Sequence, residues 1–136
     1  MADRELDAQI AVTLFGYRWV EISIQGDPPI AALLSQSIAE PRLKSYPDSF
    51  KLAKSDTKRA GDWDSFMPHF STSIVDAWQV VDRMYQDFES FSLVRRRDGL
   101  WMANFHNPHE GTGSGCGIGQ NAPCAICKAA LEAVDR

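Results

Sequence analysis

Apolar and polar positions alternate most clearly between residues 70 and 136, where they predict a helix, a pair of strands and a second helix. Over residues 73–87 the apolar residues recur at helical spacing, and Ser73 with Asp76 forms a capping box at the start. Trp78 has the largest side chain on this stripe, so we expect it to be the central packing residue of the core. The stripe consists of Ile74, Ala77, Trp78, Val81, Met84 and Tyr85.

A β-hairpin is predicted next, because Asp98-Gly99 separates two extended runs and suits a two-residue type I′ turn. That turn would pair Arg95 with Met102 and Leu93 with Asn104. One face of the hairpin would then carry Val94, Arg96, Trp101, Ala103 and Phe105. The other would carry Leu93, Arg95, Arg97, Leu100, Met102, Asn104 and His106. A slip of one residue would exchange the two faces, so the assignment depends on the turn type.

The segment Gly111–Gly119 is rich in glycine, and such segments can hold anions through their backbone N–H groups. It lacks the GK[ST] element of a phosphate-binding loop, so we interpret it as a flexible connection, with a lid over a hairpin-bound ligand as the functional alternative. Pro123 then suits the first turn of a helix that ends near Val134. The stripe of small residues on this helix would let it lie close to a sheet.

The first part of the chain predicts a helix over residues 3–15, with Asp3 as N-cap and Gly16 as its end. A strand is expected over residues 17–25. Residues 30–38 form either a short helix or a buried extended segment, and we expect Glu40-Pro41 to break it. The following residues, 42–64, are interpreted as a surface insertion, in which we single out the basic residues Lys51, Lys54, Lys58 and Arg59.

Together these elements predict one domain over residues 1–136 with an α/β fold. We expect a small α-β-α sandwich, in which an antiparallel sheet built on the Asp98-Gly99 hairpin is covered by about three helices.

Composition narrows the function classes. The chain is 44% hydrophobic and 24% charged, with a net charge of −4, which argues against a general nucleic-acid binder. A small anionic ligand held by a few arginines is compatible with this charge. No apolar run is long enough for a membrane span, and the polar start MADRELD is unlike a secretory signal. The odd number of cysteines, three, then favours a reducing compartment, the host cytoplasm.

The hairpin arginines are the candidates for ligand binding. On the predicted face Arg95 and Arg97 would hold phosphates beside Asn104 and His106, while an aromatic side chain, Trp101, stacks on a base. The structural alternative is a solvated strand end, with Arg96 lying across Trp101 as a cation–π pair.

The cysteines and histidines suggest zinc less strongly. Cys124 and Cys127 form a CxxC pair on one helix turn, with Cys116, His106 and His109 upstream. Cys127 lies on the apolar stripe, which favours a buried core thiol, and no second pair completes a tetrahedral site. Paired carboxylates and a Ser/His/Asp arrangement are also missing from the sequence. We therefore predict no metal, no cofactor and no enzymatic activity.

Three stretches resemble a known family. FSTSIVDAWQVVDRM, the tryptophan-bearing hairpin and APCAICKAALEA together look like the phage ABA sandwich proteins, and the opening DAQIAVTLFGYRW resembles that family's start. Residues 25–67 depart from the pattern. The resemblance implies an α-β-α layered fold and a phage or prophage source, and it transfers no catalytic residue.

The resemblance and the arginine face lead to a functional hypothesis. We expect a non-enzymatic phage protein, a homo-oligomer, that sequesters a nucleotide-derived signal of the host's immune response and binds neither nucleic-acid polymer nor membrane. The alternatives are a phage protein-interaction or assembly factor and a metal- or cysteine-dependent nucleotide-processing enzyme.

Overall fold

The computed structural model describes residues 4–23, 29–53, 67–88, 90–106 and 115–134. These residues form four helices and two antiparallel sheets of three strands each, so the predicted α/β class is confirmed. The chain divides into two compact units: residues 1–10 with 68–136, here the hairpin unit, and residues 11–67, here the N-terminal unit. That the two form one domain stays a prediction.

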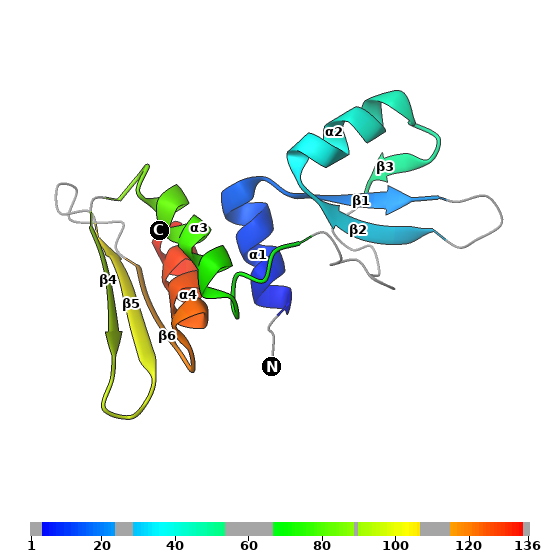
Figure 1. Ribbon diagram of the computed structural model, residues 1–136. Coiled ribbons are helices and arrows are strands. Elements are labelled where there is room, and N and C mark those ends of the chain that lie inside the picture. The colour runs from blue at the N-terminus through cyan, green and yellow to red at the C-terminus, as the bar shows by residue number, and fades with distance from the viewer. Residues whose placement is uncertain (1–3, 24–28, 54–66, 89, 107–114, 135–136) are drawn as a thin grey trace. The chain divides into compact units, whose positions relative to one another are not determined.

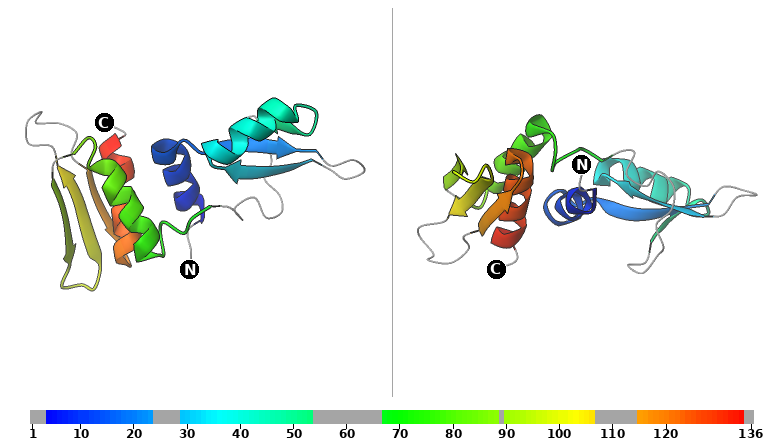
Figure 2. Two further views of the ribbon diagram at one scale, coloured as in Figure 1. Left: turned by 45° about the horizontal axis from the view of Figure 1, so that its top comes forward. Right: turned by 90° about the horizontal axis from the view of Figure 1, so that it is seen from below.

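The hairpin unit is a sheet with two helices on one face (Figure 1). Its strand order is β4 (Ser90–Arg95), β5 (Trp101–His106) and β6 (Gly115–Gly119). The helices are α3 (Ile74–Met84) and α4 (Ala122–Val134). Helix α4 packs against β6 and β5 and lies beside α3, and the right-hand view of Figure 2 shows α3 on the β4 side of α4. The side chains of Ala103 and Phe105 fill the space between the layers and are buried.

The hairpin is confirmed at Asp98-Gly99, but the predicted turn type is wrong. Arg96 N–H donates to Leu100 O at 2.7 Å, and Gly99 N–H donates to Arg96 O at 3.1 Å. Gly99 has a φ of +87°, whereas no non-glycine residue in the described ranges has a positive φ, so Asp98 cannot form a type I′ turn. The chain instead makes a three-residue turn that ends in a left-handed glycine. The register is therefore shifted by one residue, and Arg95 pairs with Trp101.

The end of the glycine-rich segment is a strand, β6, and not the flexible connection that we predicted. Its glycines alternate along the strand, and Gly115, Gly117 and Gly119 are buried against α4. A Cβ on Gly117 would overlap the backbone of Ala125, Lys128 and Ala129. Glycine at every second position thus lets the helix backbone rest on the strand, and alanines supply the facing helix surface. The small-residue stripe of α4 has the role predicted for it.

The N-cap of α3 is confirmed, since the Ser73 hydroxyl accepts a hydrogen bond from Asp76 N–H at 3.3 Å. The reciprocal bond of a capping box is not made, because Ser73 N–H donates to His69 O and the Asp76 carboxylate accepts from His69 N–H. The apolar stripe of α3, however, is rotated from the one that we predicted. The buried residues of the helix are Ala77, Val80, Val81 and Met84. Trp78 is 48% exposed and meets the ring of Phe91 edge-on at 6.1 Å, so it lies on the flank of the helix and not at the centre of the core.

The start of α1 (Arg4–Phe15) is attached to the hairpin unit by polar contacts. Asp7 is fully buried, and its carboxylate accepts hydrogen bonds from the Arg4 guanidinium and from Ser71 N–H, both at 2.6 Å. Arg4 also donates to Pro68 O at 3.1 Å and lies 3.0 Å from His69 Nδ1. The ion pair compensates the burial of the carboxylate, so α1 begins on a polar anchor.

The N-terminal unit includes the last residues of α1, from Ala11 onward. Gly16 has a φ of +69°, and Tyr17 N–H donates back to Ala11 O at 3.0 Å, so a left-handed glycine ends the helix. This confirms the predicted glycine stop. The predicted N-cap, Asp3, lies outside the described residues. A three-stranded sheet follows in the order β2 (Ile30–Leu34), β1 (Arg18–Ile22) and β3 (Phe50–Leu52).

Residues 30–38, for which the sequence left two alternatives, are divided between them: β2 ends at Leu34 and α2 (Gln36–Ser45) begins two residues later. The expected break at Glu40-Pro41 is wrong, because α2 continues through Pro41. An interior proline costs a helix about 3 kcal/mol. Ala39 is fully buried in the core of this unit and Leu43 packs against it, and we attribute the continuity of α2 to this packing.

Candidate functional site

The five residues of the predicted site are not brought together on one face. With the observed register, Arg95 and Trp101 lie on the face of the sheet that carries buried Ala103 and Phe105. Asn104 and His106 lie on the opposite face. Arg97 is in the turn and exposed. The prediction that Arg95 and Asn104 share a face is therefore wrong, because the extra turn residue shifts the register by one.

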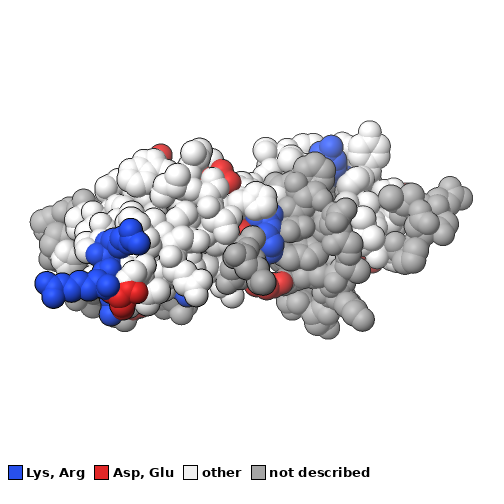
Figure 3. Space-filling model, turned by 60° about the horizontal axis from the view of Figure 1, so that its bottom comes forward, with Lys and Arg blue, Asp and Glu red and all other residues white. Residues whose placement is uncertain are grey.

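The cation–π pair is made by a different arginine from the expected one. The guanidinium carbon of Arg95 lies 5.9 Å from the Trp101 ring centroid, while Arg96 forms an ion pair with Asp98 at 3.1 Å. Figure 3 shows the basic side chains gathered over the end of the hairpin with acidic atoms beside them. Partial neutralisation by Asp98 makes this end a poorer anion site than the sequence suggests. Whether these residues bind a ligand stays a prediction.

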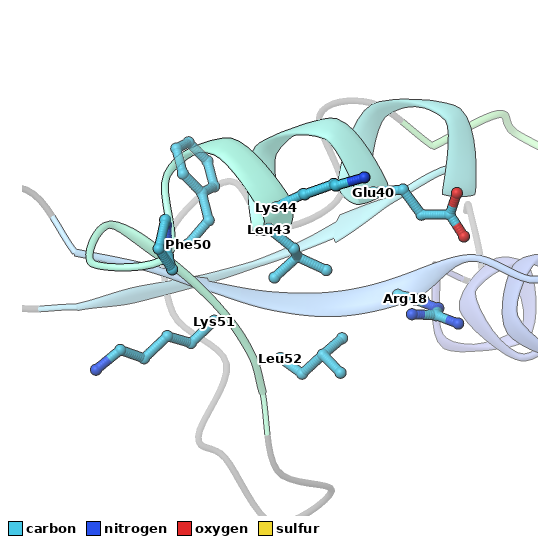
Figure 4. A pocket seen from close by; sticks show the side chains of 8 residues that line it. Arg18, Glu40, Leu43, Lys44, Phe50, Lys51 and Leu52 are labelled. Atoms are coloured by element: carbon cyan, nitrogen blue, oxygen red, sulfur yellow. The ribbon is translucent and has the colours of Figure 1, made fainter.

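A groove in the N-terminal unit combines positive charge with an apolar floor. Its volume is about 620 Å³, and it lies open to solvent between α2, β1 and β3. Figure 4 shows Arg18, Glu40 and Lys44 toward one end, Lys51 extending in the other direction, and Leu43 and Leu52 between them. The lining residues are Arg18, Glu40, Leu43, Lys44, Pro47, Phe50, Lys51 and Leu52.

The floor of the groove continues the core of this unit. Leu43 and Phe50 are partly buried against a cluster of four buried side chains: Val20, Ala32, Leu34 and Ala39. The buried cluster between α2 and the sheet thus holds the floor in place. The charged residues at the rim of the groove extend from the same elements. Arg18 is the first residue of β1, Lys44 lies in the last turn of α2 and Lys51 is in β3.

The charge of the groove is not balanced internally. Arg18 and Lys44 lie toward the end that holds one carboxylate, Glu40, whose oxygen accepts a hydrogen bond from Gln36 at 3.0 Å. Lys51 pairs across strands with Glu21 and extends away from that end. Within the described part of the chain, none of the three cations forms an ion pair. In a protein with a net charge of −4, this local excess of positive charge can bind an anion with an apolar or aromatic part.

Sequence reasoning named Lys51 among the basic residues of an insertion, but it singled out neither Arg18 nor Lys44. The signal for Lys44 was the pair Ala39 and Leu43, spaced four residues apart across Pro41, which the expected helix break concealed. Arg18 required knowledge that β1 pairs with β3 across more than 25 residues of chain. The other basic residues named in that insertion, Lys54, Lys58 and Arg59, lie outside the described residues.

The cysteines are distributed over two elements of the hairpin unit. Cys116 is exposed on β6, Cys124 is half-buried on α4, and Cys127 is fully buried, which confirms the predicted core thiol. Among the described residues, no cluster of three or more His, Cys, Asp or Glu side chains could hold a metal ion. His109, the remaining member of the zinc hypothesis, is outside this part of the chain.

Comparison with known proteins gives a family and a fold. The model of the phage ABA sandwich domain matches residues 43–131, including part of the stretch that appeared to depart from it and excluding the opening helix. A crystal structure of a phage protein from Bacillus cereus ATCC 14579 is similar, with a TM-score of 0.54 and 23% identity over 100% of this chain and 90% of that one. No curated protein matches. No helix in the described ranges has the length and hydropathy needed to cross a membrane.

Proposed function

Because the chain belongs to the phage ABA sandwich family, we propose that it is a phage protein that binds a nucleotide-derived signal of the host's immune response and holds it unreacted. It would act in the host cytoplasm as a sponge, lowering the free concentration of the signal. The phage connection of the family and of the similar crystal structure supports the setting of this proposal. The chemistry of the groove supports the ligand class.

The observation that carries the proposal is a set of cations around an apolar floor that form no ion pair with another described residue. Arg18 and Lys44 approach one end of the groove, where they can bind phosphate oxygens. Each charge-assisted hydrogen bond contributes about 1.5–3 kcal/mol. Phe50 offers a ring, and Leu43 offers apolar surface, for a nucleobase. A ligand that carries both phosphate and base uses both parts of the groove, whereas inorganic phosphate uses only one.

The experiment mixes the protein with a panel of cyclic di- and trinucleotides and cyclic ADP-ribose isomers and measures thermal shift and heat of binding. A ligand that binds is then released by heating and identified by mass. We expect at least one member to bind and to be recovered intact. Recovery of a chemically altered ligand would show that the protein is an enzyme. The absence of binding to any member of the panel would favour a protein-interaction factor.

Paired variants locate the site. The double variant Arg18→Ala, Lys44→Ala removes two cations from the groove, and Arg95→Ala, Arg97→Ala removes two from the hairpin, so the net charge of the two proteins is equal. We expect the groove variant to lose at least a hundredfold in affinity and the hairpin variant to bind like the parent. A loss of affinity in the hairpin variant but not in the groove variant would instead place the binding site at the hairpin arginines.

A further inference from the structure

We infer that the chain pairs with a second copy of itself through the free edge of β4, and that the exposed stripe of α3 completes the interface. Strand β4 lies at one edge of its sheet, and among the described strands it pairs only with β5. The inference concerns the ligand-free protein, and it stands on the hairpin unit, separately from the groove.

The backbone groups that β4 leaves open can be assigned residue by residue. Arg96 and Leu100 are hydrogen-bonded at the turn, at 2.7 Å, and bonded and non-bonded pairs alternate along an antiparallel ladder. The pairs of Val94 with Met102 and of Ser92 with Asn104 are therefore bonded ones. The intervening residues of β4 point their N–H and C=O groups away from β5. These residues are Phe91, Leu93 and Arg95.

This edge has few of the features that prevent strand pairing. Natural edge strands are protected by proline, lysine, bulges or a covering segment. The sequence of β4, SFSLVR, holds neither proline nor lysine, and its register with β5 is unbroken from Ser90 to Arg95. Its one charge, Arg95, is at the end of the strand. A regular strand edge of this length is a template for a further strand.

An apolar stripe on α3 lies beside the same edge. Ile74, Trp78 and Tyr85 are 49%, 48% and 51% exposed, and their spacing places them on one flank of the helix. The ring of Trp78 meets Phe91 of β4, so this flank faces the β4 side of the sheet (Figure 2). Three large apolar side chains next to an open strand edge form a patch of the kind found at protein interfaces.

A second copy of the chain fits both features at once. A two-fold axis perpendicular to the sheet pairs β4 with its copy in antiparallel orientation, with Leu93 opposite Leu93 of the second copy. In this register Phe91 meets Arg95 of the second copy, so no like charges oppose each other. The same axis places the two α3 stripes on one face of a continuous sheet. An unrelated extended peptide would satisfy the edge alone and leave the stripe exposed.

The test measures self-association of the full-length, ligand-free protein by light scattering and sedimentation over a range of concentrations. Leu93→Pro removes an outward N–H from β4, and Trp78→Lys places a charge in the stripe. The matched controls are Ile118→Pro and Ile118→Lys on β6. Because Ala103 and Gly117 form a bonded pair, the N–H of Ile118 points out from the opposite edge of the sheet.

We expect the parent and both Ile118 variants to dimerise equally, and Leu93→Pro and Trp78→Lys to weaken dimerisation at least tenfold. Amide exchange at Phe91 and Leu93 should slow as the parent's concentration rises. If Leu93→Pro fails to fold by circular dichroism, the exposed substitution Trp78→Lys decides. A parent that stays monomeric at all concentrations, dimers that persist in Trp78→Lys, or Ile118 variants that dissociate equally would each overturn the inference.

Discussion

The two three-stranded sheets pack their helices in different ways. In the hairpin unit the backbone of α4 rests on β6, with glycine facing alanine and no room for even a methyl group at Gly117. In the N-terminal unit α2 packs through larger side chains, its own Leu43 and Phe50 of β3, and an open groove remains beside it. Small residues thus mark the place where the fold is closed, and long charged ones mark the place where it is open to solvent.

The largest effect should come from adding one carbon to the closed interface. Gly117→Ala puts a Cβ into backbone atoms of α4, which cannot move aside as a flexible side chain would. We expect a loss of unfolding free energy of about 3 kcal/mol or more, measured by denaturant titration. Cys116→Ala changes the neighbouring, exposed position and should stay within about 0.5 kcal/mol of the parent. Equal stabilities of the two variants would contradict the close packing.

The polar anchor of α1 should give the next largest effect. Asp7→Ala leaves Arg4 and the N–H of Ser71 without their carboxylate partner in a buried environment. Removing one member of a buried ion pair costs about 3–5 kcal/mol, and the 17% exposure of Arg4 places this case at the lower end. Gln9→Ala, an exposed position on the same helix, is the control. A change below about 1 kcal/mol for Asp7→Ala would show that water replaces the carboxylate.

The sequence predicted those elements whose signals are local. Helix caps and stops such as Ser73 and Gly16, and the Asp98-Gly99 turn, depend on neighbouring residues and are found where expected. The turn's extra residue was beyond such reasoning, because Asp-Gly suits both two- and three-residue turns. That single residue reversed the face of Arg95 and dispersed the predicted site.

Non-local packing accounts for the remaining differences. The alternating glycines Gly115, Gly117 and Gly119 indicate a strand only when α4 is known to lie on them. Likewise α2 continues through Pro41 because Ala39 and Leu43 pack on a distant sheet. The groove joins β1 with β3 and α2, so its residues share no sequence pattern.

The variant Trp78→Ala tests whether the contribution of an aromatic side chain to stability follows its size or its burial. A fully buried tryptophan would cost about 3–5 kcal/mol on truncation to alanine. Since Trp78 is 48% exposed and packs mainly on Phe91, we expect about 1–2 kcal/mol, measured at dilution where the chain is monomeric. Phe105→Ala, at the 1% exposed centre of the same ring cluster, is the comparison and should cost about twice as much or more. A larger loss of unfolding free energy for Trp78→Ala than for Phe105→Ala would show that Trp78 is a core residue after all.

The smallest effect on stability is expected at the groove. Arg18→Ala and Lys44→Ala remove exposed cations that have no ion-pair partner in the described ranges, so each should change the unfolding free energy by less than about 0.5 kcal/mol. Leu43→Ala, which shortens the floor of the same groove, should cost more, because that side chain packs on the core of the unit. If removal of the cations proved as costly as removal of the leucine, the charges would serve the fold and the groove would lose its claim as a binding site. If the cation variants instead keep the parent's stability and lose affinity for a phosphate-bearing ligand, the two cations serve binding and not folding. The sheet beside the groove would then differ from the sheet of the hairpin unit in function as well as in packing.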